Sequence, residues 1–259
     1  MTNTIRSVAV TLAGAFGAWM LQQTFGSNKL SGGSVLLYFL VGLVVLVAAA
    51  AWQYRYYTPG QDGVSADEVP AREPTFARFL SRSQLAAPLW LGIRLFLAYT
   101  WLNAGWHKFG DPKWMVTGES ILGNWTRAVT PNQAGVAPAP YEFFRNFLQF
   151  MIESQAHTWF SKLIVFGELA VGLGLLFGTL TGFAALGGIL MNTSFIFAGS
   201  LSSNPLLLLL EILLVWGWRA AGWLGLDRVL LPLLGVPGAP RADVATRGAT
   251  TASSNPAAV

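Results

Sequence analysis

The chain has no cysteine among its 259 residues, only two histidines, and few charged side chains, 11% in all. The absence of cysteine excludes disulfides, thiolate metal sites, iron–sulfur clusters and covalently attached c-type haem. Two histidines with no further ligand spacing give no basis for a metal site. Any electron carrier would therefore have to be diffusible or belong to a partner subunit.

The scarcity of charge is matched by an excess of apolar residues. Hydrophobic residues make up 53% of the chain, and its mean hydropathy is +0.50. Several apolar runs approach or exceed 18 residues, so the sequence predicts an all-α, polytopic membrane protein in a lipid bilayer. The formal net charge of +4 comes from basic residues that flank these runs. This pattern is typical of membrane topology signals, and no nucleic-acid partner is expected.

Residues 1–57 are predicted to form an N-terminal transmembrane helix or hairpin. The apolar segment 7–25 could be a first span or a cleavable signal. The span is favoured, because Arg6 is the only basic residue before it and no A-x-A site follows. Segment 35–52 is the surer span and ends in an aromatic and basic belt. Residues 58–84 contain several prolines and no apolar periodicity, which predicts a solvated cytoplasmic linker.

The segment 85–106 should cross the membrane, because its 22 residues make about 33 Å of helix against a hydrocarbon core of about 30 Å. Arg94 lies roughly 13 Å from its start. A lone guanidinium at that depth costs at least about 2.5–3.5 kcal/mol, so another part of the chain must supply a partner.

Residues 110–158 are too long for a plain connection and form an insert. A short helix is expected near 119–129, and 141–156 has the spacing of an amphipathic helix that lies at the membrane interface or packs as a lid over the bundle. Three closely connected spans follow at 160–180, 182–199 and 205–218, the last extendable through 219–223. Residues 236–259 are rich in Ala, Ser, Thr and Pro, which predicts a disordered tail.

Basic residues give the orientation. Eight arginines lie on the side of the linker and C-terminus, against five lysines and arginines on the side of the insert. The positive-inside rule therefore places the linker and C-terminus in the cytoplasm and the insert outside.

Four buried polar residues come from four different spans: Arg94, Glu168, Asn192 and Glu211. One interpretation is structural, with Arg94 paired to Glu168 or Glu211 and Asn192 bonding between helices. The other is functional, in which the group binds a polar head group or relays protons. Two carboxylates outnumber the single arginine, so one carboxylate is left without a cationic partner. This surplus carboxylate favours the second interpretation.

The end of the Arg94 span carries a further polar and aromatic group. His107 could hydrogen-bond a carbonyl oxygen, and Lys108 could attract an anion or extend to the lipid head groups. Trp106 and Asn103 lie beside them, and Trp106 is also typical of the aromatic belt.

Four segments carry a family resemblance: IRLFLAYTWLNAGWHKFGDPKW (93–114), FGELAVGLGLLFGTLTGFAALGG (166–188), MNTSFIFAGSLSSNPLLLL (191–209) and GLDRVLLPLLG (225–235). In this order they resemble the DoxX family of bacterial membrane proteins, which shares its domain with DoxD, the large subunit of thiosulfate:quinone oxidoreductase. The resemblance implies a four-helix domain over 85–235 and a quinone-linked oxidoreductase. The recurring polar positions map to Arg94, Lys108, Asp111, Glu168, Asn192 and Asn204.

The leading hypothesis is therefore a multi-pass oxidoreductase subunit of the cell membrane, with diffusible quinone as electron acceptor and thiosulfate or a similar reduced sulfur anion as donor. In it Arg94 and Lys108 hold negative charge, Glu168 accepts a proton and His107 orients a quinone oxygen. The residues expected to complete the site are Asn103, Trp106, Asn192, Asn204 and Glu211. An additional redox subunit would be a partner. The alternatives are a non-catalytic anchor or scaffold for a redox complex and a carrier of small molecules or lipids.

Overall fold

A computed structural model describes residues 3–26, 32–57 and 74–235, and this part of the chain is helical with no strand. The expected all-α architecture is confirmed. Four helices are long and apolar enough to cross a membrane: α1 (Asn3–Gly26), α2 (Gly32–Tyr54), α4 (Ala87–Phe109) and α8 (His157–Phe177). The protein is thus suited to a multi-pass membrane location.

Two further apolar helices, α9 (Thr181–Phe197) and α10 (Asn204–Trp216), pack against each other. They are about 26 Å and 20 Å long, both shorter than a hydrocarbon core of about 30 Å. The expected extension of α10 is present as a separate short helix, α11 (Trp218–Gly222). The two helices are separated by Gly217, where any Cβ would lie 2.7 Å from the Trp90 ring.

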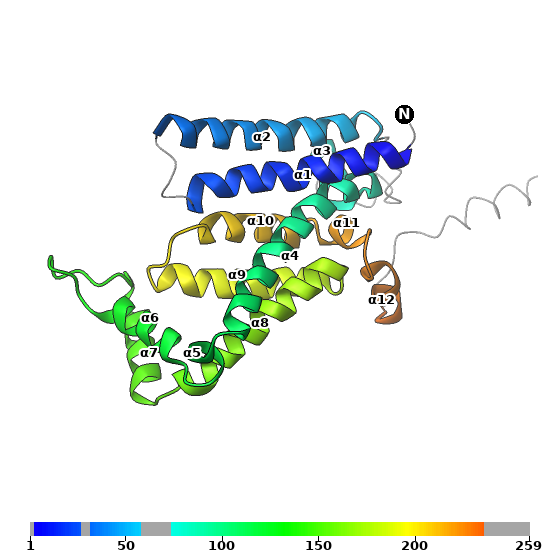
Figure 1. Ribbon diagram of the computed structural model, residues 1–259. Coiled ribbons are helices and arrows are strands. Elements are labelled where there is room, and N and C mark those ends of the chain that lie inside the picture. Colours follow the sequence, from blue (N-terminus) through cyan, green and yellow to red (C-terminus); the bar gives the residue numbers. More distant parts are fainter. Residues whose placement is uncertain (1–2, 27–31, 58–73, 236–259) are drawn as a thin grey trace, which may run out of the picture.

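Figure 1 shows how the helices are arranged. α1 and α2 form an antiparallel hairpin, and α1 also packs along α4. α4 pairs with α8, and α8 contacts α9. The start of α1, the α8–α9 turn, α11 and α12 (Asp227–Leu233) gather at one end of the bundle, while the insert and the α9–α10 connection lie at the other.

Glycines allow α1 to approach its two neighbours closely. A Cβ on Gly92 of α4 would lie 2.2 Å from the Thr11 carbonyl oxygen and 3.0 Å from the Gly14 Cα. Gly17 and Gly42 meet in the same way between α1 and α2, where a Cβ on Gly42 would lie 2.8 Å from the Gly17 carbonyl oxygen. Small residues at such crossings let backbones pack without an intervening side chain.

One expectation for the linker is wrong. Residues 75–82 form helix α3 (Thr75–Arg82), followed by a single 3₁₀ turn, η2 (Gln84–Ala86). Phe79 is fully buried, with its ring 5.2 Å from that of Tyr54, and the Trp90 indole nitrogen donates to the Leu80 carbonyl at 2.7 Å. This stretch is therefore docked on the bundle. The remainder of the predicted linker, 58–73, and the predicted tail, 236–259, lie outside the described residues.

The insert contains α5 (Pro112–Met115), α6 (Glu119–Val129) and α7 (Glu142–Glu153), so both helices expected there are confirmed. α6 and α7 pack through Ile121, Trp125, Leu148 and Met151. Gly118, at φ +74°, fixes the insert to α8: a Cβ there would lie 2.3 Å from the His157 carbonyl oxygen. The left-handed φ and the close approach both require glycine.

Candidate functional site

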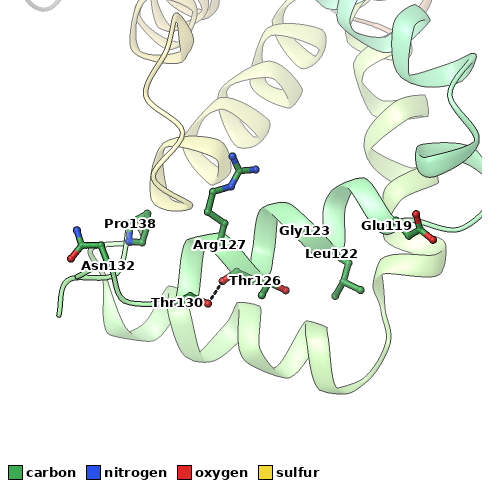
Figure 2. A pocket seen from close by; sticks show the side chains of 8 residues that line it. All are labelled: Glu119, Leu122, Gly123, Thr126, Arg127, Thr130, Asn132 and Pro138. Atoms are coloured by element: carbon green, nitrogen blue, oxygen red, sulfur yellow. Dashed lines mark hydrogen bonds between the residues drawn. The ribbon is translucent and has the colours of Figure 1, made fainter. Parts of the chain in front are cut away.

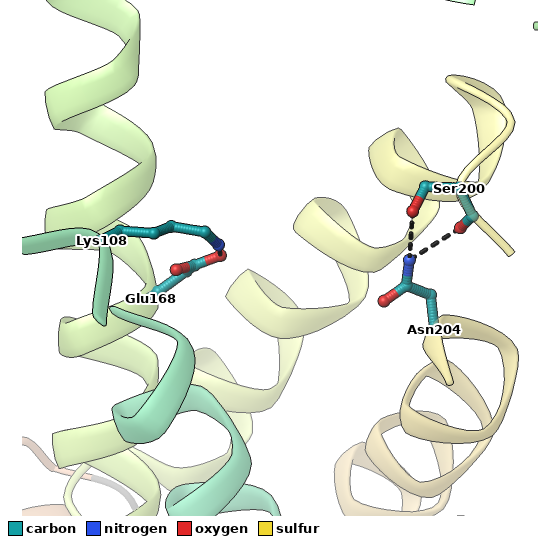
Figure 3. Close-up of polar contacts among 4 residues, drawn as sticks. All are labelled: Lys108, Glu168, Ser200 and Asn204. Carbon is teal, nitrogen blue, oxygen red and sulfur yellow. Dashed lines mark hydrogen bonds and ion pairs between the residues drawn. The ribbon is translucent and has the colours of Figure 1, made fainter. Parts of the chain in front are cut away.

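The candidate site is a buried ion pair between Lys108, in the last turn of α4, and Glu168, in the middle of α8 (Figure 3). The Glu168 side chain is 1% exposed and that of Lys108 23%. Glycines bring the two helices together here, since a Cβ on Gly105 would lie 2.9 Å from the Leu169 side chain. The position of Lys108 three residues after Gly105 directs its ammonium along the same face toward α8.

Aromatic rings surround the ammonium group. The Lys108 Nζ lies 5.0 Å from the ring centroid of Trp114 and 5.9 Å from that of Phe195. Such rings stabilise a cation whose hydration shell is incomplete. The second oxygen of Glu168, Oε2, is buried and has no hydrogen-bond partner within the described residues. Lys108 has three N–H donors, and Glu168 Oε1 takes one.

This arrangement has a defined chemical capacity. A carbonyl or anionic oxygen of a small molecule could accept a hydrogen bond from the remaining donors of Lys108, while the unpartnered oxygen of Glu168 could accept a proton or a hydrogen bond. The site therefore combines a positive charge, a proton acceptor and flat apolar walls.

The second carboxylate, Glu211, forms a separate group farther along the bundle. Its Oε1 accepts from the Trp101 indole nitrogen at 2.7 Å and its Oε2 from the Asn192 amide at 2.9 Å. Glu211 and Asn192 are fully buried. Gly188 admits the carboxylate, because a Cβ there would lie 2.4 Å from Glu211 Oε1. The expected interhelical role of Asn192 is thus present, with Trp101 as an additional donor.

Arg94 does not join either carboxylate, so the expected pairing with Glu168 or Glu211 is wrong. Its guanidinium extends to the opposite end of the bundle, where Nη1 donates to the Ala221 carbonyl and Nη2 to the Leu224 carbonyl, each at 2.7 Å. The negative charge of Asp227 interacts favourably with the guanidinium. The Arg94 side chain is only 1% exposed, so its full length lies inside the bundle between its Cα and these carbonyls.

Asp227 was not singled out from the sequence. Its carboxylate is buried and accepts hydrogen bonds from the backbone N–H groups of Leu180 and Thr181, and so caps the start of α9. The residue that caps the N-terminus of a helix normally lies directly before that helix in the sequence, so a local pattern can predict it. This one comes from 46 residues downstream, so no local pattern could indicate it.

Three expected site residues lie apart from the ion pair. Asn103, Trp106 and His107 are exposed on α4, with Trp106 69% exposed. His107 directly precedes Lys108 and lies about 100° from it around the helix, so it is on a different face. Asn204, at the start of α10, donates to the Ser200 carbonyl at 2.7 Å and closes the α9–α10 turn (Figure 3).

A shallow groove of about 710 Å³ lies along α6, and neither Lys108 nor Glu168 lines it (Figure 2). No residue predicted for the site lines it; its lining residues are Glu119, Leu122, Gly123, Thr126, Arg127, Thr130, Asn132 and Pro138. Among the described residues, no three histidine or acidic side chains come together to hold a metal ion.

Comparison of the chain with protein-family models, with curated proteins and with solved structures gives no match.

Proposed function

We propose that this protein is a membrane-embedded, quinone-linked oxidoreductase subunit, and that the quinone head group binds at Lys108 and Glu168. The observation that carries the proposal is the buried ion pair with an unpartnered carboxylate oxygen, flanked by Trp114 and Phe195. Buried ionisable groups are costly in a membrane protein and are commonly retained for binding or proton transfer.

These residues fit a quinone. A quinone head group is flat and has two carbonyl oxygens that accept hydrogen bonds, and it carries an apolar tail. The Lys108 ammonium supplies the donor and the two aromatic rings supply flat apolar contacts. The bilayer around the helices would hold the tail.

Reduction of a quinone to a quinol consumes two electrons and two protons. Lys108 would stabilise negative charge on the reacting oxygen, and Glu168 would carry a proton to it. Thiosulfate, or a similar reduced sulfur anion, would supply the electrons, two thiosulfate ions joining through a new S–S bond to give tetrathionate. Since the chain has no cysteine, the electrons would pass directly or through a cofactor of an additional redox subunit.

Arg94 and His107 have no part in this site. Arg94 is engaged by backbone carbonyls at the other end of the bundle, and His107 lies on an exposed face of α4. Of the residues predicted to be catalytic, Glu168 alone stays in the proposal, and Lys108 becomes its main binding group.

The test is thiosulfate-dependent reduction of a soluble quinone analogue by purified protein. Glu168→Gln is expected to lower turnover by about 10²–10⁴-fold, the range for loss of a proton-transfer group. Lys108→Gln is expected to lower it by about 10²–10³-fold, the range for loss of one charge-stabilising donor. Lys162→Gln is the matched control, because Lys162 lies on α8, the helix that carries Glu168, but its ammonium donates to the Thr158 carbonyl. Thermal unfolding of each variant separates lost chemistry from lost fold. Turnover that is unchanged in folded Glu168→Gln would refute the assigned site.

A non-catalytic anchor or scaffold for a redox complex is the second candidate. It is favoured by the structural engagement of the other buried polar residues: Arg94 binds backbone carbonyls, and Glu211 binds Trp101 and Asn192. This candidate expects no turnover in well-folded protein, co-purification of a redox partner, and assembly that survives Glu168→Gln.

A further inference from the structure

We propose that α7 is an interfacial helix whose three phenylalanines, Phe143, Phe147 and Phe150, are inserted in the lipid leaflet at the insert's end of the bundle. We call these three residues the phenylalanine face. The inference concerns how the insert meets the membrane and does not depend on the proposed function.

The phenylalanine face is exposed although α7 already has a buried side. Its residues are spaced i, i+4 and i+7, so they share one side of the helix, and they are 64%, 43% and 64% exposed. The adjoining side, with Leu148 and Met151, is buried against α6. Packing of the insert therefore explains Leu148 and Met151 but not the three phenylalanines.

The C-terminal end of α7 lies where the membrane begins. Three residues, 154–156, separate α7 from α8, and α8 is one of the four helices able to span a bilayer. Trp159, in the first turn of α8, is 56% exposed, as expected for a tryptophan in the aromatic belt of the interface. Phe150 is thus held close to the level of the lipid head groups.

The N-terminal end of α7 is tied to another helix at the same end of the bundle. The rings of Tyr141, Phe143 and Phe144 lie 5.0, 5.9 and 5.6 Å from the ring of Phe197, the last residue of α9. Since the two ends of α7 are fixed to the end of α9 and the start of α8, the helix lies across the bundle end.

The phenylalanine face continues an apolar surface along α9. Phe183, Leu186 and Leu190 are 73%, 48% and 69% exposed, and Phe197 follows them on the same helical stripe. This exposed apolar stripe lies on a helix packed against the span α8, which is the position expected of a lipid-facing surface. The contact between the rings of Phe143 and Phe197 joins the end of this stripe to the phenylalanine face.

The rest of α7 is suited to water. Its exposed polar residues lie together on the flank of the phenylalanine face opposite Leu148 and Met151: Glu142, Asn146, Gln149 and Glu153. An apolar face beside a polar one is the arrangement of a helix that lies in the plane of the membrane interface. The occupant of the phenylalanine face is therefore the acyl-chain boundary of the bilayer.

The natural sequence has no cysteine, so a single introduced cysteine is the only residue that a thiol-reactive label can modify. Full-length Phe150→Cys and Gln149→Cys are each labelled with a nitroxide and reconstituted in phosphatidylcholine vesicles. Collisions with oxygen, which concentrates in lipid, and with a water-soluble nickel chelate are measured by electron paramagnetic resonance. We expect the ratio of oxygen to nickel collisions to be several-fold higher at position 150 than at 149.

Phe147→Cys provides a second probe of the phenylalanine face should Phe150→Cys fail to fold. Equal, nickel-dominated collisions at 149 and 150 would place the face in water and overturn the proposal. Low accessibility to both reagents at 147 and 150 would also overturn it, because a protein surface or a second copy of the chain would then cover the face.

Discussion

At the scale of single residues, the buried polar side chains are distributed over three places instead of one. Lys108 pairs with Glu168, Glu211 accepts from Asn192, and Arg94 donates to backbone carbonyls, each without contact to the others. Placement in neighbouring spans correctly predicts that Asn192 makes an interhelical hydrogen bond. The same reasoning fails for Arg94, because a long side chain can extend several ångströms toward either end of its helix. The position of the residue in the sequence does not determine the direction in which it extends.

The fit of Glu211 against Gly188 predicts a large effect from one methyl group. Gly188→Ala places a Cβ 2.4 Å from Glu211 Oε1, so the carboxylate must move from its donors. We expect a loss of about 1–3 kcal/mol in the free energy of unfolding, the usual cost of overpacking. Thermal unfolding in detergent measures it.

Gly123→Ala is the control for that measurement, because a Cβ at Gly123 of α6 meets nothing within 4 Å. It should be neutral or stabilise by about 0.5–1 kcal/mol, since alanine is the better helix former. Equal destabilisation by both substitutions would contradict the tight contact at Gly188.

The two carbonyl bonds of Arg94 predict that lysine cannot replace it. Lysine keeps the charge but lacks the two-pronged geometry that reaches both Ala221 and Leu224. Arg94→Lys should lower stability by about 1.5–3 kcal/mol, the value of one hydrogen bond to a charged group. Arg127→Lys, on exposed α6, should stay within about 0.5 kcal/mol of the wild type. Similar melting temperatures for Arg94→Lys and wild type would contradict this role.

At the scale of helices, α3 shows how a short element gains its stability from packing. Its eight residues are too few for an isolated helix, but Phe79 is buried among Tyr54, Tyr57 and Phe76. The proline-rich surroundings and interspersed charges suggested a solvated segment. The buried Phe79 and the hydrogen bond from Trp90 are among the contacts that dock it.

Phe79→Ala should therefore release α3 from the bundle. Removal of a fully buried phenylalanine costs about 3–5 kcal/mol. Hydrogen–deuterium exchange of the α3 amides, followed by mass spectrometry, should show faster exchange in this variant. Phe76→Ala, which removes a ring that is 44% exposed, should have a smaller effect. Slow exchange in Phe79→Ala would mean that other contacts hold the helix.

At the scale of the whole molecule, the two ends of the bundle differ in kind. One end carries the compact polar group of Arg94, Asp227 and the α8–α9 turn, and the other carries the insert (Figure 1). The distribution of basic residues predicts that the Arg94 end faces the cytoplasm.

Cysteine labelling in intact cells tests this orientation. Gln133→Cys in the insert and Val229→Cys in α12 are both at exposed positions and leave the basic residues unchanged. A membrane-impermeant maleimide should label Gln133→Cys in intact cells and Val229→Cys only after permeabilisation. The reverse result would show that the bundle is inverted and that the insert is cytoplasmic.

The sequence by itself determined the membrane character, the helical class and the positions of the long helices, because these depend on composition and on the local period of apolar residues. It also predicted Lys108 and Glu168 for the same site, and the structure pairs their side chains. Only the tertiary structure decided that Arg94 binds Ala221 and Leu224, that Asp227 caps α9, and that Phe79 docks α3. Each of these joins segments distant in the chain or depends on where one side chain extends, and local patterns contain no information about such contacts.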